Sequence, residues 1–119
     1  MQQIGSISAK VITLLDLSVV AGAPIYLGAS NIMHMQQKHP ADYMKYGADI
    51  PGILAAPDYV GLNPTDNSIE YVKEYLINGE FVKVAVRVTA SGRFYARSIY
   101  ALNRNRVQNF IRKGTLKRT

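Results

Sequence analysis

Residues 68–102 read SIEYVKEYLINGEFVKVAVRVTASGRFYARSIYAL, and this stretch decides the fold. Three runs rich in β-branched and aromatic residues (68–77, 80–89 and 93–102) are separated by Asn78-Gly79 and by the turn-forming residues 90–92. Runs of this length and composition are typical of strands, and Asn-Gly between two of them favours a tight hairpin. The stretch therefore predicts an antiparallel meander of three long strands.

The Asn-Gly turn predicts the register of the first hairpin. A two-residue loop places Glu74 opposite Lys83 and Glu70 opposite Arg87. Residues 69, 71, 73 and 75 then lie opposite valines of the second strand, on the other face of the sheet. We therefore expect one mostly apolar face and one face that carries matched charges.

The second turn, TASGR (89–93), leaves two registers open. A three-residue loop with a left-handed Gly92 places Arg87 opposite Tyr95, and Ser98 and Tyr100 then point with the valines. A two-residue loop instead brings Ser98 and Tyr100 to the face of the charged residues. The pattern favours the first register because it keeps three arginines off the valine core. The face opposite the valines then carries Lys83, Arg87, Arg93, Tyr95 and Arg97.

The rest of the chain predicts helices around this meander. The apolar run at 11–20 is shorter than the roughly 20 residues of a membrane span, so we expect a first core element, either a strand or a short helix. Capping and proline signals predict helices over about 30–38, 41–46, 49–56 and 103–113, with a short strand at 58–62 and a turn at 63–67. We predict one α+β domain, 1–119, with N-terminal helices packed on a four-stranded antiparallel sheet and a basic C-terminal helix or tail at about 103–119.

Charge is distributed unevenly along the chain. The net charge is +6, yet residues 1–82 carry four basic and eight acidic residues, and residues 83–119 carry ten basic and no acidic residues. Such asymmetry favours an anionic partner, with nucleic acid the usual one, over a merely solubilising tail. The absence of cysteine excludes disulfides and thiolate metal sites and fits a reducing, cytoplasmic compartment.

Both histidines lie in NIMHMQQKHP (31–40). Five residues span about 500° of helix, so His34 and His39 do not share a face and lack the spacing of a helical metal pair. We expect no metal site and no cofactor. His34 lies on a polar stripe, where it is either a surface residue or a general acid–base group. His39 follows an apolar stripe, which favours a packed or helix-ending histidine.

The candidate chemistry is metal-free cleavage of RNA. This reaction needs a base for the 2′-hydroxyl, an acid for the leaving oxygen and cations for the phosphate. His34 and Glu70 are candidates for proton transfer, although Glu70 is equally explained as a cross-strand ion-pair partner of Arg87. Ser98 and Tyr100 share one strand face and can hold a phosphate or stack on a base; the alternative is that both are core residues.

Four segments in this order resemble the phage-associated branch of the barnase–EndoU–colicin–RelE nucleases. They are SNIMHMQQKHP, PGILAAPDYVG, YVKEYLINGEFVKVAVRVT and ARSIYAL, and the resemblance covers about residues 25–103. It implies the same α+β fold and metal-independent RNA cleavage, often of tRNA, that leaves a 2′,3′-cyclic phosphate.

The resemblance also implies site residues. His34 corresponds to the acid or base, with His39 less secure, and Lys83 or Arg87 corresponds to the phosphate-binding strand residue. Ser98 and Tyr100 match the hydroxyl-x-Tyr signature of the last strand, with Ser in place of the commoner Thr. This conflicts with the register favoured above, so either the loop has two residues, a bulge realigns the strand, or one group is not catalytic.

The sequence therefore predicts an endoribonuclease, in keeping with a toxin or effector of a phage or mobile element that can be delivered into a target cell. The alternatives are a non-catalytic nucleic-acid-binding module and a structural or packaging protein of a phage. The expected partner is RNA, and a toxin implies an immunity or antitoxin protein; no membrane partner is expected. The expected catalytic residues are His34, Arg87, Ser98, Tyr100, Lys83, His39 and Glu70, and the expected nucleic-acid-binding residues are Arg93, Arg97, Arg104 and Arg106.

Overall fold

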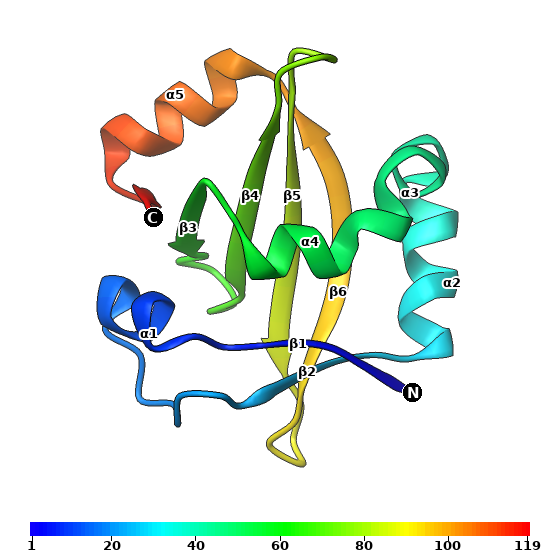
Figure 1. The fold of residues 1–119 in the computed structure, drawn as a ribbon, viewed down its shortest axis with the longest axis vertical. Coiled ribbons are helices and arrows are strands. Elements are labelled where there is room, and N and C mark those ends of the chain that lie inside the picture. Colours follow the sequence, from blue (N-terminus) through cyan, green and yellow to red (C-terminus); the bar gives the residue numbers. More distant parts are fainter.

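The computed structural model describes all residues, 1–119, and is built on a seven-stranded sheet (Figure 1). Its strand order is β1-β2-β6-β5-β4-β3-β7. All neighbouring strands are antiparallel except β2 and β6, which are parallel. The strands are β1 (Gln2–Ser6), β2 (Pro24–Leu27), β3 (Tyr59–Leu62), β4 (Ile69–Tyr75), β5 (Glu80–Val88), β6 (Phe94–Leu102) and β7 (Leu116–Arg118).

The helices lie at the edges and on both faces of this sheet. They are α1 (Ala9–Leu15), α2 (Ala29–Lys38), α3 (Pro40–Tyr46), a 3-10 turn η1 (Gly47–Asp49), α4 (Ile50–Ala55) and α5 (Arg104–Lys113). Helix α4 crosses one face of the long strands, α2 and α3 lie beside β6, and α5 lies at the far end near β3 and β4 (Figure 1). None of the helices combines the length and the apolar composition that a membrane-spanning segment requires.

The α+β class is confirmed, but the expected four-stranded antiparallel sheet is wrong. The four predicted strands form the centre, and β1, β2 and β7 extend the sheet to a mixed one. These three strands have only 5, 4 and 3 residues and little alternation of polar and apolar side chains. Such short segments carry almost no local signal, because their hydrogen-bond partners are far away in the sequence.

The first core element is the short helix α1, which begins at the capping residue Ser8. The Ser8 side chain accepts a hydrogen bond from the backbone N–H of Val11, and Val11 is buried. The helix ends at Asp16, whose φ of 53° lies in the left-handed region. The remainder of the apolar run, 16–20, is not helical.

The β4–β5 hairpin keeps the predicted faces but shifts the predicted register by two residues. Its loop has four residues, 76–79, and Tyr75 pairs with Glu80. Glu70 therefore lies opposite Ala85, not Arg87, and Glu74 lies opposite Phe81. A shift by two leaves every side chain on its expected face, because strand side chains alternate with period two.

The β5–β6 hairpin confirms the three-residue loop and adds a bulge. The Thr89 N–H donates to the Arg93 carbonyl oxygen at 2.8 Å, and Gly92 is left-handed at φ 85°. Arg87 pairs with Tyr95 as expected. The register then shifts between Ala85 and Val86, and one residue of β6, Arg97, has no partner on β5.

The central strands have two faces, and this bulge determines which β6 residues lie on each of them. On the core face, side chains of β4–β6 pack under α4 and the β1–β2 ribbon, and the buried set includes Tyr71, Val84, Val86, Ala96 and Ile99. The opposite face we call the open face; its polar residues are Glu70, Lys83, Arg87, Ser98 and Tyr100. Helix α5 covers only one end of the open face, through a second cluster of Val72, Phe81, Leu102, Val107 and Leu116.

The C-terminal basic segment is part of the folded domain. Val107 and Leu116 are almost fully buried, and β7 pairs with β3. The Thr119 hydroxyl donates to the carbonyl oxygen of Pro57 at 2.6 Å. The segment at 103–119 therefore helps to hold the sheet, in addition to carrying charge.

Candidate active site on the open face

The Arg97 bulge assembles the candidate site. With unbroken alternation, Ser98 and Tyr100 would enter the valine core and Ile99 would face solvent. The extra residue instead places Ser98 beside Ala85 and Tyr100 beside Lys83, while Ile99 is fully buried beside Val84. Burial of a large aliphatic side chain in place of a hydroxyl stabilises this arrangement. The bulge is one of the three possibilities that the sequence left open. It allows the three-residue turn at 90–92 and also places Ser98 and Tyr100 on the same face as Lys83.

Lys83 and Glu70 form a buried ion pair at the base of the site. Lys83 Nζ lies 2.8 Å from Glu70 Oε2, and the two residues are only 5% and 8% exposed. The Asn63 amide also donates to Glu70 Oε2, at 3.3 Å. Burial would lower the pKa of Lys83, but hydrogen bonds to Glu70 and Tyr100 outweigh it and raise the pKa above its ordinary value. Lys83 is therefore cationic at neutral pH. The expected pairing of Glu70 with Arg87 is wrong, because Glu70 lies opposite Ala85 and forms its ion pair with Lys83.

Tyr100 is placed between this lysine and His39. Lys83 Nζ lies 4.8 Å from the centre of the Tyr100 ring, and the His39 ring stacks on the same tyrosine with 5.1 Å between centroids. His39 ends α2 and is half-buried, so it is the packed, helix-ending histidine that the sequence favoured. The half-buried Tyr100 is thus held on the open face and not among the valines.

Arg87 is oriented by the loop between β3 and β4. Its Nη2 donates to Asp66 Oδ2 at 2.7 Å, and its Nε donates to Ser68 Oγ at 3.4 Å. Hydrogen bonds from Ser68 and the charge of Arg87 hold the pKa of Asp66 below its usual range. The sequence identified this loop only as a turn, so Asn63, Asp66 and Ser68 were missed as site residues; an Asx-rich turn next to a charged strand was the available signal.

His34 reaches the site because β6 is only partly paired on its outer edge. Strand β2 pairs with β6 only at Phe94 and Tyr95, and α2 packs beside β6 beyond that point. Helix α3 fixes the same edge, since Asp42 Oδ2 accepts a hydrogen bond from the Ala101 N–H at 3.0 Å. The exposed His34 of α2 therefore lines the same cavity as the open-face residues.

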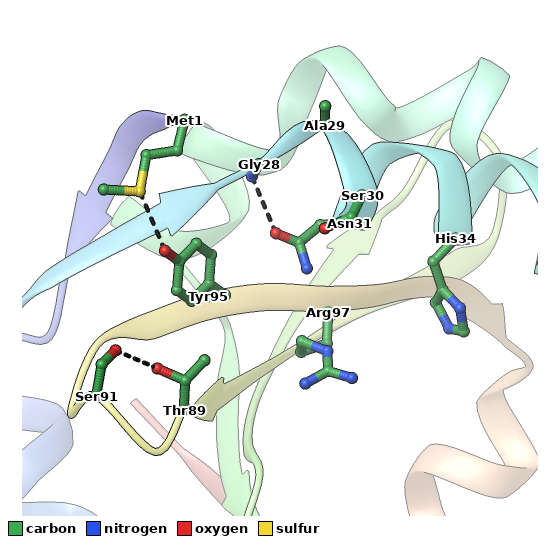
Figure 2. Close-up of a pocket in the computed structure, with 10 residues that line it drawn as sticks. All are labelled: Met1, Gly28, Ala29, Ser30, Asn31, His34, Thr89, Ser91, Tyr95 and Arg97. Atoms are coloured by element: carbon green, nitrogen blue, oxygen red, sulfur yellow. Dashed lines mark hydrogen bonds between the residues drawn. The ribbon is translucent and has the colours of Figure 1, made fainter.

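Two neighbouring cavities meet at His34 and Arg97. The smaller, about 310 Å³, is lined by the open-face residues and the β3–β4 loop: His34, Asn63, Asp66, Ser68, Glu70, Ala85, Arg87, Arg97, Ser98 and Tyr100. The larger, about 730 Å³, lies between the start of α2 and the β5–β6 turn (Figure 2). The smaller cavity thus brings together one histidine, two arginines, three hydroxyl groups and two carboxylates, one of which is the Glu70 carboxylate of the buried ion pair.

The remaining predicted residues lie outside this cavity. Lys83 lies beneath it, between the rings of Tyr100 and Phe110. Arg93 is at the hairpin tip, 5.9 Å from the centre of the Tyr26 ring. Arg104 and Arg106 project from α5, where Arg104 pairs with Glu74 at 3.0 Å. No group of three or more His, Asp or Glu side chains has an arrangement that could hold a metal ion.

A face that joins a histidine, fixed cations and hydroxyls around a small cavity has the groups that phosphodiester cleavage requires. These groups define a candidate site in a nuclease-like α+β protein. The chain belongs to the phage-Barnase-EndoU-ColicinE5/D-RelE like nuclease 3 family, whose model matches residues 2–109. The resemblance identified from the sequence is confirmed. No curated protein and no solved structure shows significant similarity to the chain.

Proposed function

We propose that this protein is a metal-independent endoribonuclease that cleaves RNA, including tRNA, by attack of a 2′-hydroxyl on the adjacent phosphate. The observation that carries the proposal is the Arg97 bulge, which places Ser98 and Tyr100 on the same face as Lys83 and Arg87. Membership of the family indicates a nuclease, and the geometry supports RNA as the substrate and a metal-independent reaction.

In this mechanism the scissile phosphate occupies the smaller cavity. Arg87 and Arg97 bind its non-bridging oxygens, and Ser98 donates a hydrogen bond to one of them. Lys83 lies beneath Tyr100 as a fixed positive charge that stabilises the additional negative charge of the transition state.

His34 is the proposed base. It takes the proton of the 2′-hydroxyl as the 2′-oxygen forms a bond to phosphorus. The bond from phosphorus to the 5′-oxygen breaks, and the Tyr100 hydroxyl donates a proton to the leaving oxygen. The products are a 2′,3′-cyclic phosphate and a free 5′-hydroxyl. Glu70 positions Lys83 and does not act as a base, because its carboxylate is buried in the ion pair.

The basic helix α5 is proposed to extend the RNA-binding surface. Arg106, Arg112 and Lys113 are exposed, and none of them forms a salt bridge. Such side chains bind phosphates along a nucleic acid and hold it beside the site.

The test is cleavage of total tRNA and of a labelled single-stranded RNA in excess EDTA. We expect cleavage by the wild type and none of an all-2′-O-methyl RNA, which lacks the nucleophile. A shift of intact RNA on a native gel without cleavage would instead support the alternative of a non-catalytic binding module.

A further inference from the structure

The larger cavity is not used by the proposed chemistry, although it adjoins the site. Its volume of about 730 Å³ lies within the range of roughly 300–1,000 Å³ typical of small-molecule sites. It shares His34 and Arg97 with the smaller cavity. If a ligand places a phosphate between those two side chains, the group next to that phosphate can therefore occupy the larger cavity.

The lining of the larger cavity favours ligands with hydrogen-bond acceptors. None of its ten lining residues is acidic. Donors come from the Arg97 guanidinium, the Asn31 amide and the hydroxyl groups of Ser30 and Tyr95. The smaller cavity, in contrast, contains the carboxylates of Asp66 and Glu70.

Asn31 is fixed so that its donors point into the cavity. Its Oδ1 accepts a hydrogen bond from the backbone N–H of Gly28 at 2.9 Å, which sets the orientation of the amide. The amide nitrogen then points toward the space between Tyr95 and Arg97 (Figure 2). Gly28 keeps this geometry open, because a Cβ there would lie 3.3 Å from Asn31 Oδ1.

Tyr95 contributes an aromatic ring beside these donors. Its ring packs against Tyr26 with 5.9 Å between centroids, which limits its motion. Its hydroxyl donates a hydrogen bond only to Met1 Sδ, with 3.1 Å between the oxygen and the sulfur. A thioether is a weak acceptor, so a stronger acceptor on a ligand can replace it. The ring and hydroxyl are therefore available to a flat, polar ligand.

We propose that the larger cavity is a subsite for the nucleoside next to the scissile phosphate, with Asn31 and Tyr95 as residues that determine its base preference. This inference rests on the proposed function, since RNA brings the base. A nucleobase presents carbonyl and ring-nitrogen acceptors to the Asn31 amide and a flat surface to Tyr95. Single-stranded RNA is required, because a paired base cannot present this edge.

The test measures affinity for uncleavable all-2′-O-methyl hexanucleotides by fluorescence anisotropy. Asn31→Asp keeps the acceptor for Gly28 and removes the amide donors, and we expect it to weaken binding about ten-fold. Tyr95→Phe removes only the hydroxyl and should fold normally. We expect this variant also to bind the hexanucleotide more weakly than wild type. Gln36→Glu is the matched control, because it makes the same charge change at an exposed position of α2 outside both cavities.

A hexanucleotide with an abasic residue next to the phosphate should bind wild type and Asn31→Asp equally. Equal affinities of wild type, Asn31→Asp and Tyr95→Phe for the intact hexanucleotide would overturn the subsite, as would an equal loss in Gln36→Glu. Cleavage of unmodified RNA is scored separately. If the wild type cleaves RNA but Asn31→Asp binds the hexanucleotide as tightly as wild type, the subsite is contradicted and the proposed catalysis is not. If Asn31→Asp binds more weakly but the wild type does not cleave RNA, the proposed catalysis is contradicted and the subsite is not.

Discussion

At the scale of single residues, His34 and His39 show how position separates two similar side chains. His34 is exposed between two cavities, and His39 stacks on Tyr100 where α2 ends. Helical spacing predicted that they do not share a face. It could not show that His34 faces the cations of β5 and β6, because that contact depends on how α2 packs against the sheet.

His34→Ala should abolish RNA cleavage with little change in stability. Loss of a general base lowers the rate roughly 10²–10⁴-fold, and removal of an exposed side chain changes the free energy of unfolding by at most about 0.5 kcal/mol. Initial rates on labelled RNA and urea unfolding check both. Gln36→Ala on the same helix is the control. Full activity of His34→Ala would exclude His34 from the mechanism.

Lys83→Met should destabilise the protein by about 3–5 kcal/mol, because it leaves Glu70 buried without its partner. The double variant Lys83→Met/Glu70→Leu should recover most of that stability and remain inactive. Urea unfolding measured beside cleavage separates the two effects. An active double variant would show that the lysine charge has no role in cleavage.

The same pair predicts a pH dependence. The pKa of Lys83 is raised above its ordinary value of 10.5 in the folded chain, so the unfolded chain loses this proton first. Its contribution to stability is complete below pH 10.5 and is lost as the pH rises through the folded pKa. The free energy of unfolding should therefore fall more steeply above pH 10.5 in wild type than in the double variant. Parallel curves would argue against this linkage.

At the scale of elements, the meander could be predicted and its surroundings could not. Alternation and turn residues predicted three long strands, their faces and the three-residue loop at Gly92. The four-residue loop at 76–79 departs from the tight hairpin that Asn78-Gly79 favours, and contacts of Tyr75 and Glu80 with α3 and η1 accompany it. These contacts join segments that are distant in the sequence, and so do the pairings of the three short strands, so local patterns do not predict them.

The bulge at Arg97 gives the sharpest prediction for an element. Deleting Arg97 removes the unpaired residue, so Ser98, Ile99 and Tyr100 can keep Ala85, Val84 and Lys83 as partners in a continuous ladder. We therefore expect the deletion variant to fold with the open face intact and to lose the Arg97 guanidinium from the cavity. Arg97→Ala keeps the bulge and should fold normally while it cleaves about 10²-fold more slowly. Urea unfolding and cleavage rates compare the two. Wild-type cleavage rates in both variants would exclude the Arg97 guanidinium from phosphate binding.

At the scale of the whole molecule, the C-terminal segment both carries positive charge and packs against the sheet. The sequence predicted a basic C-terminal helix or tail, and the structure has the helix α5 at Arg104–Lys113. Val107, Leu116 and β7 make this segment part of the packed domain. Truncation at 103 would therefore unfold the sheet edge. Its role in binding must be tested by substitution of exposed side chains.

RNA affinity should fall steeply with salt, and the triple variant Arg106→Gln/Arg112→Gln/Lys113→Gln should reduce the slope. Loss of three phosphate contacts lowers the slope of log affinity against log salt by about two for a single strand. The slope is measured by titrating RNA from low to high salt with His34→Ala and with His34→Ala that also carries the triple substitution. The His34→Ala background keeps the RNA intact. An unchanged slope would remove α5 from the RNA-binding surface.

The central claim is that the open face catalyses attack by a 2′-hydroxyl without a metal. The most direct measurement is the chemical nature of the new ends, by mass spectrometry of RNA fragments produced in excess EDTA. The mechanism predicts a 2′,3′-cyclic phosphate on one fragment and a 5′-hydroxyl on the other, both absent with His34→Ala. Fragments that carry a 5′-phosphate, or RNA that remains intact with wild type, would contradict it.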